Sequence, residues 1–71
     1  MSMLKVIEVL AESDEGFDAA VRTAVTQAAQ SVRNIKSVYV KEMNARVDGG
    51  QITHYRVNVK ISFLLDDQAV G

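Results

Sequence analysis

The sequence predicts an α+β fold in which one helix packs across one face of a three-stranded antiparallel sheet. Three observations indicate this fold: an alternating apolar segment near the N-terminus, a helical apolar stripe after it, and two alternating segments separated by Asp-Gly-Gly. Strict alternation is typical of half-buried strands, and recurrence every three or four residues is typical of amphipathic helices. The predicted order is β-α-β-β, in a single domain of 71 residues.

The first strand is predicted at residues 4–11, where the sequence reads LKVIEVLA. Val, Ile and Leu dominate the segment, as is typical of strands. Alternation places Ile7 and Val9 on one face and Glu8 and Leu10 on the other. One face of this strand is therefore expected to pack on the helix.

The helix is predicted next, from an apolar stripe rich in alanine, whose small side chains would let the helix approach a sheet closely. Ser13 is the predicted N-cap, and the nearby Asp14, Glu15 and Asp18 suit the positive end of a helix dipole. The helix is expected to end near Asn34, with Arg22, Gln27 and Gln30 on its wet side. The stripe consists of Phe17, Ala20, Val21, Ala24, Val25, Ala28 and Val32.

Two more strands are predicted on either side of VDGGQ, residues 47–51, since Asp and Gly tolerate the positive φ of a hairpin turn. The last strand would place on one face Tyr55, Val57, Val59, Ile61 and Phe63, and on the other Arg56, Asn58, Lys60 and Ser62. The strand before the turn would place on one face Val38 and Val40, and on the other Ser37, Tyr39, Lys41 and Met43. If the last strand also pairs with the first, the strand order is 1-3-2, and residues 66–71 form a flexible tail.

The predicted lengths favour self-assembly. A helix of about 18 residues spans about 27 Å, whereas hairpin strands of about 12 residues span about 40 Å. One helix cannot cover such a ribbon, and a long edge strand is rarely left open. Small domains without disulfides or metals often associate, and this chain has no cysteine. Polar exposure of the second face is the alternative.

Composition excludes several function classes. A net charge of −1 gives no basic field for nucleic acid. The absence of cysteine excludes a Cys-based zinc site. The sequence has neither a bilayer-length apolar run nor a signal-peptide core. A cytoplasmic protein is the resulting expectation.

Few residues suggest catalysis or metal binding. His54 is the only histidine, and no spacing gives it an orienting partner or a nucleophile. The acidic residues around the helix start are explained by the helix dipole better than by a metal site, because no loop has EF-hand spacing. The glycines at 49 and 50 lead into a strand, so they do not form a phosphate loop. We therefore expect no catalytic residue and no metal site.

The polar face of the predicted hairpin is the remaining candidate site. Arg56 and Asn58 on one strand share this face with Ser37 and Tyr39 on the neighbouring strand. The face could be a solvated exterior. It could also bind a ligand at a subunit boundary, where Arg56 would offer two donors to an anionic or amide-bearing group.

The segments KVIEVLAESDEGFDAAV, SVRNIKSVYVKEM and ITHYRVNVKISF resemble the dodecin family over nearly the whole chain. The markers are the joint ESDEGFDAA, the Asn-Ile entry to the second strand, its Val-Lys-Glu, and the spacing of aromatic and valine residues in the last strand. The resemblance implies a hollow homododecamer of β-α-β-β protomers. It also implies that flavins are bound at subunit boundaries for storage or protection, without enzymatic activity.

The same resemblance implies site residues. Flavin-binding dodecins stack a tryptophan on the flavin ring, and the matching position here is Ser37. Their glutamine in a Tyr-Gln-Val motif, which bonds to the polar edge of the flavin, corresponds to Arg56. Loss of the stacking ring should weaken FMN or riboflavin binding at least about tenfold, with Tyr39 as a partial substitute. The alternative is a flavin-free assembly that binds another anionic small molecule or metal ions.

Overall fold

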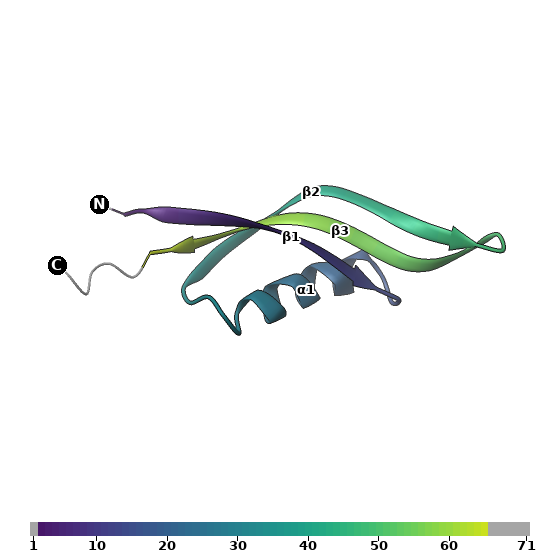
Figure 1. Cartoon of the computed structure of the whole chain (residues 1–71), viewed down its shortest axis with the longest axis horizontal. Coiled ribbons are helices and arrows are strands. Elements are labelled where there is room, and N and C mark those ends of the chain that lie inside the picture. The colour runs from purple at the N-terminus through teal and green to yellow at the C-terminus, as the bar shows by residue number, and fades with distance from the viewer. Residues whose placement is uncertain (1, 66–71) are drawn as a thin grey trace.

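The computed structural model describes residues 2–65. Its elements are β1 (Leu4–Ser13), α1 (Phe17–Ala28), β2 (Ile35–Asp48) and β3 (Gln51–Leu64). The sheet has the order β1-β3-β2, and both neighbouring pairs are antiparallel. Figure 1 shows α1 against one face of the sheet, with the tip of the β2–β3 hairpin extending beyond the helix. The predicted α+β fold and strand order are confirmed, whereas the tail predicted at 66–71 lies outside the described residues.

The core is small and lies between α1 and the middle of β3. Val57, Val59 and Ile61 are fully buried on the helix side of β3. Ala20 and Ala24 are the buried residues of α1, so the predicted alanine stripe does bring the helix close to the sheet. Burial of each large side chain contributes about 1.5–3 kcal/mol. Among residues 2–65, the buried core consists of Ala11, Ala20, Ala24, Val57, Val59 and Ile61.

The helix begins differently from the prediction. Ser13 is not its N-cap but the last residue of β1, and its hydroxyl accepts a hydrogen bond from the Glu15 amide at 2.9 Å. The N-cap is Gly16, which offers no side chain, and its carbonyl accepts the first helical bond from the Ala20 amide at 3.1 Å. β1 extends two residues further than its apolar pattern indicated, so Ser13 belongs to the strand. Its hydroxyl therefore satisfies a backbone donor in the turn before the helix and not one in the helix itself.

The helix also ends at Ala28, about two turns before the predicted end near Asn34. After it, the amides of Gln30 and Ser31 bond to carbonyls three residues earlier, at 3.1 and 3.0 Å. This tighter turn ends the α-helical ladder. Asn34 then has a φ of 64°, which Asn tolerates better than most residues and which redirects the chain into β2.

The β2–β3 connection is shorter than predicted. Only Gly49 and Gly50 lie between the strands, with φ values of 61° and 78°, and Asp48 pairs directly with Gln51. Two residues with positive φ match the right-handed twist of a hairpin, which explains why two glycines suffice.

One predicted facing was wrong. Met43 was expected on the face of Tyr39, but it pairs with the buried Val57 on the helix side of the sheet. A register shift between Val40 and Glu42 inserts Lys41 as an extra residue, and an extra residue reverses the alternation that follows it. Sequence alternation alone does not reveal such a bulge.

The hairpin extends well past the helix. Strands of 14 residues span about 46 Å, whereas a helix of 12 residues spans about 18 Å. The mismatch is larger than the sequence indicated, and Met43, Val47 and Ile52 are more than half exposed near the hairpin tip. Within residues 2–65, no helix is long and apolar enough to cross a membrane.

Candidate functional site

The candidate site lies on the sheet face opposite α1, which we call the outer face. Pairing and alternation define it, because residues that pair directly lie on the same face of a sheet. This face carries charge together with exposed leucine, valine and tyrosine, so it differs from a uniformly polar exterior. Its members are Leu4, Val6, Glu8, Leu10 and Glu12 of β1, Ser37, Tyr39, Lys41, Glu42, Asn44 and Arg46 of β2, and His54, Arg56, Asn58, Lys60, Ser62 and Leu64 of β3.

The four predicted ligand residues share the outer face but do not meet at one point. Ser37 pairs with Ser62, and the two hydroxyls are hydrogen-bonded. Arg56 lies on β3 six residues before Ser62, which corresponds to a separation of about 20 Å. Tyr39 and Asn58 lie between them, and Tyr39 is 64% exposed. A compact ligand therefore cannot contact both Ser37 and Arg56 of one protomer.

Arg56 already has a partner within its own chain. Its Nε donates to Glu12 Oε2, a residue that it faces directly in the β1–β3 pairing. This hydrogen bond is the main cause that lowers the pKa of Glu12 below its ordinary value of 4.5. The charge of Arg56 is thus largely compensated. Sequence reasoning missed Glu12 as this partner, which only the cross-strand register identifies.

A second ion pair joins the two edge strands. The Nζ of Lys41 on β2 lies 3.3 Å from Oε2 of Glu8 on β1. The bond to Lys41 lowers the pKa of Glu8 below 4.5, and hydrogen bonding from Asn58 lowers it further. The other polar atom of that asparagine, Oδ1, is buried and has no hydrogen-bond partner. Buried acceptors are usually paired, so this oxygen is unusual.

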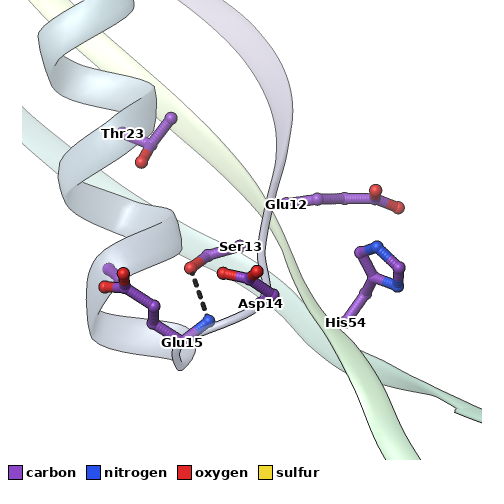
Figure 2. A pocket seen from close by; sticks show the side chains of 7 residues that line it. Glu12, Ser13, Asp14, Glu15, Thr23 and His54 are labelled. Atoms are coloured by element: carbon purple, nitrogen blue, oxygen red, sulfur yellow. Dashed lines mark hydrogen bonds between the residues drawn. The ribbon is translucent and has the colours of Figure 1, made fainter.

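An open depression of about 420 Å³ lies where β1 turns into α1, and it is lined by Glu12, Ser13, Asp14, Glu15, Ala19, Thr23 and His54. Figure 2 shows Thr23 on the helix and Glu12 and His54 on the strand side of this depression. The His54 ring contacts the Thr53 hydroxyl at 3.2 Å, while the Ser13 hydroxyl bonds to the Glu15 amide. The Ser13 hydroxyl is therefore not bonded to the histidine as a nucleophile would be to its base.

The carboxylates near this depression do not converge on one point. Asp18 forms an ion pair with Arg22, one helical turn later, at 2.7 Å, and Glu12 bonds to Arg56. In the part of the chain that the structure describes, no three His, Asp or Glu residues are arranged to hold a metal ion. The depression gathers acidic groups, but they are spread or already paired.

Comparison with known proteins identifies the family to which this geometry belongs. The family model described as Dodecin matches residues 3–66. Calcium dodecin of Mycobacterium tuberculosis is 38% identical over 64 residues, which are 89% of each chain. The dodecin of Thermus thermophilus is 27% identical over 63 residues, 89% of this chain and 91% of the relative. The solved dodecin of Streptomyces coelicolor superposes with a TM-score of 0.88 at 35% identity, over 92% of this chain and 93% of that one.

Proposed function

Since the chain belongs to the dodecin family, we propose that it forms a non-enzymatic homododecameric shell that binds and stores a flavin, FMN or riboflavin, on the outer face. The flavin affinity is weaker than in dodecins with the stacking tryptophan, because Ser37 occupies the corresponding position. The observation that carries this proposal is family membership over nearly the whole chain. The cytoplasmic location stays a prediction.

Assembly is supported by the surfaces that one protomer leaves uncovered. In the described part of the chain the core has six residues, three of them alanines, which is little burial for an isolated domain. Several large apolar side chains are more than half exposed in the single chain: Met3, Leu4, Val6, Leu10, Tyr39, Met43, Val47 and Ile52. Exposed apolar surface of this kind marks protein–protein contacts in soluble proteins.

Assembly also reconciles the proposed site with its geometry. Ser37 and Arg56 are too far apart to contact one ring within a protomer, at about 20 Å along the sheet. Two copies whose outer faces meet in antiparallel fashion would bring Ser37 of one close to Arg56 of the other. The proposed flavin site is therefore composite, with Ser37, Tyr39, Arg56 and Asn58 contributed by more than one subunit.

Riboflavin titration of the purified protein tests this function. Binding against an aromatic ring quenches flavin fluorescence. We therefore expect quenching that saturates at a fixed ratio of riboflavin to protein, and because the affinity is weak, it requires a high protein concentration. Size-exclusion chromatography with light scattering measures the mass of the particle in the same sample. A monomer at micromolar concentration would contradict the assembly, and unchanged fluorescence at all protein concentrations would contradict the flavin role.

A flavin-free assembly that binds another anionic small molecule or metal ions is the second candidate. One observation favours it: one relative is named calcium dodecin. Asp14 and Glu15 are carboxylates that line the depression beside β1, so Asp14 is the residue to test. Calorimetric titration with CaCl₂ separates the candidates. Heat that saturates with Ca²⁺ and disappears in Asp14→Asn, together with unquenched riboflavin, would favour this second function.

A further inference from the structure

The Lys41–Glu8 ion pair spans the whole width of the sheet. Glu8 belongs to β1 and Lys41 to β2, and β3 lies between these two edge strands. Neighbouring strands are about 4.8 Å apart, so the two backbones are separated by about 10 Å. Because their charged ends are 3.3 Å apart, the two side chains must extend across the outer face of β3.

The side chains of Glu8 and Lys41 cross β3 beside Asn58. Glu8 pairs with Lys60, two residues along β3 from Asn58. Lys41 is the extra residue of the β2 bulge, immediately before the position that pairs with Asn58. Asn58 also contributes, after Lys41, to the lowered pKa of Glu8, which is consistent with its place beside the same carboxylate. The ion pair and the asparagine therefore form one cluster.

The cluster leaves one polar atom unsatisfied. Asn58 Oδ1 is buried without a donor, although its residue lies on an otherwise open face. The ion pair that crosses beside it is half exposed, at 44% for Lys41 and 45% for Glu8. Exposed ion pairs contribute little to stability, whereas a buried acceptor without a partner is costly. Breaking this exposed ion pair should therefore cost little, and a new hydrogen bond to Oδ1 would satisfy a group whose burial is otherwise unfavourable.

We propose that the Lys41–Glu8 pair is a removable cover over Asn58, and that a flat ligand with an N–H donor displaces it and bonds to Asn58 Oδ1. This inference rests on the proposed ligand role of the outer face and specifies its chemistry. The exposed ring of Tyr39, which pairs with Lys60, lies diagonally across from Asn58 and provides a surface against which a flat ring can lie. Cyclic imides and amides have both features, and riboflavin contains such an imide.

The ligand experiment removes the cover. Lys41→Met keeps the aliphatic length but loses the ammonium group, so riboflavin should bind about two- to fivefold more tightly than to the wild type, because an exposed ion pair no longer has to be broken. Adding Asn58→Leu to this variant should abolish the gain. Lys36→Met is the matched control, since Lys36 is an exposed lysine in the other bulged part of β2. An unchanged affinity in Lys41→Met, or an equal gain in Lys36→Met, would contradict the proposal that the Lys41–Glu8 pair covers Asn58.

A second experiment tests the cover without any ligand. The chain has three asparagines, Asn34, Asn44 and Asn58, so ¹⁵N-asparagine labelling gives three side-chain amide signals. The Asn58 amide should exchange its protons more slowly than the Asn44 amide. The chemical shift of the Asn58 amide signal should change in Lys41→Met and stay the same in Lys36→Met. An Asn58 signal that exchanges as fast as Asn44 and ignores Lys41→Met would show that no cover exists.

The two readouts separate the inference from the function on which it rests. If no variant quenches riboflavin, the flavin role fails and the ligand half of the inference fails with it, while the asparagine spectrum still decides the cover. If the wild type quenches riboflavin and the asparagine signals do not respond to Lys41→Met, the outer face binds flavin and the cover is refuted.

Discussion

Arg56 and Asn58 lie two residues apart on the central strand, and their surroundings differ sharply. Arg56 is paired with Glu12 of its own chain, so little of its charge is available to an anionic ligand. Asn58 keeps an acceptor that nothing in residues 2–65 satisfies. At the scale of single residues, Asn58 therefore offers a hydrogen-bond acceptor more readily than Arg56 offers a free cation.

Position 37 allows a direct test of the proposed site. Ser37→Trp should tighten riboflavin binding at least about tenfold, because a stacking ring contributes about 1 kcal/mol or more beyond its buried area. The measurement is fluorescence quenching against riboflavin concentration. Ser37→Leu is the control, since it adds apolar area without an aromatic ring. An equal gain in both variants would count against stacking at this position.

The carboxylates of the outer face make stability depend on pH in the acidic range. Glu8 and Glu12 have a lowered pKa in the folded chain, through Lys41 and Arg56 respectively. Their stabilisation is therefore fully present above the ordinary pKa of 4.5 and is lost as the pH falls through the lowered values. We expect the melting temperature to fall below about pH 4.5 and to be nearly flat between pH 6 and 8.

The double variant Glu8→Gln/Glu12→Gln checks the cause. It should melt at a lower temperature than the wild type at pH 7, and the difference should shrink as the pH approaches 3. Thermal unfolding followed by circular dichroism measures both proteins. A difference that grows on acidification would contradict the assignment, because it has the opposite sign.

At the scale of elements, α1 is defined by small residues that face the sheet. Ala24→Leu, at a site that is 2% exposed, should destabilise the fold by about 1–3 kcal/mol through overpacking. Thr26→Leu, on the exposed side of the same helix, should change stability by less than about 0.5 kcal/mol. Urea unfolding measures both variants, and comparable losses would mean that α1 does not pack as closely as Ala20 and Ala24 indicate.

The hairpin turn depends on its two glycines. Gly50→Ala places a Cβ at a φ of 78°, which should cost about 1–2 kcal/mol. Gly16→Ala is the control, because its φ of 163° is extended backbone and no atom lies within 4 Å of the added carbon. Chemical unfolding at pH 7 compares the two variants, and an equal loss would exclude backbone strain at the turn as the cause.

At the scale of the whole molecule, the part that the structure describes measures 57 × 19 × 13 Å, and α1 covers only part of the sheet. Leu10 on the outer face is 64% exposed in the single chain. If the outer faces of two copies meet, Leu10→Glu should shift the particle to a smaller species, because it would bury an unpaired carboxylate. Light scattering gives the mass. Gln27→Glu, which adds the same charge on the exposed side of α1, should leave it unchanged.

The sequence by itself determined the fold class, the order of the four elements and the face of most strand residues. These follow from periodicity, which is a local property that each segment carries without its neighbours. The position of Ser37 and Arg56 on one face followed in the same way. The motifs also indicated the family, which the comparisons confirm.

Only the tertiary structure decided what depends on how segments meet. Met43 lies on the face opposite to the predicted one because a bulge at Lys41 adds one residue. Ser13 belongs to β1 and not to the helix start because it pairs with Tyr55 of β3. The pairs Glu12–Arg56 and Glu8–Lys41 join residues 44 and 33 positions apart, and no local pattern encodes such a register. The unsatisfied oxygen of Asn58 follows from those same long-range contacts, so the sequence located the outer face while the pairing of its strands decided which groups on it are free.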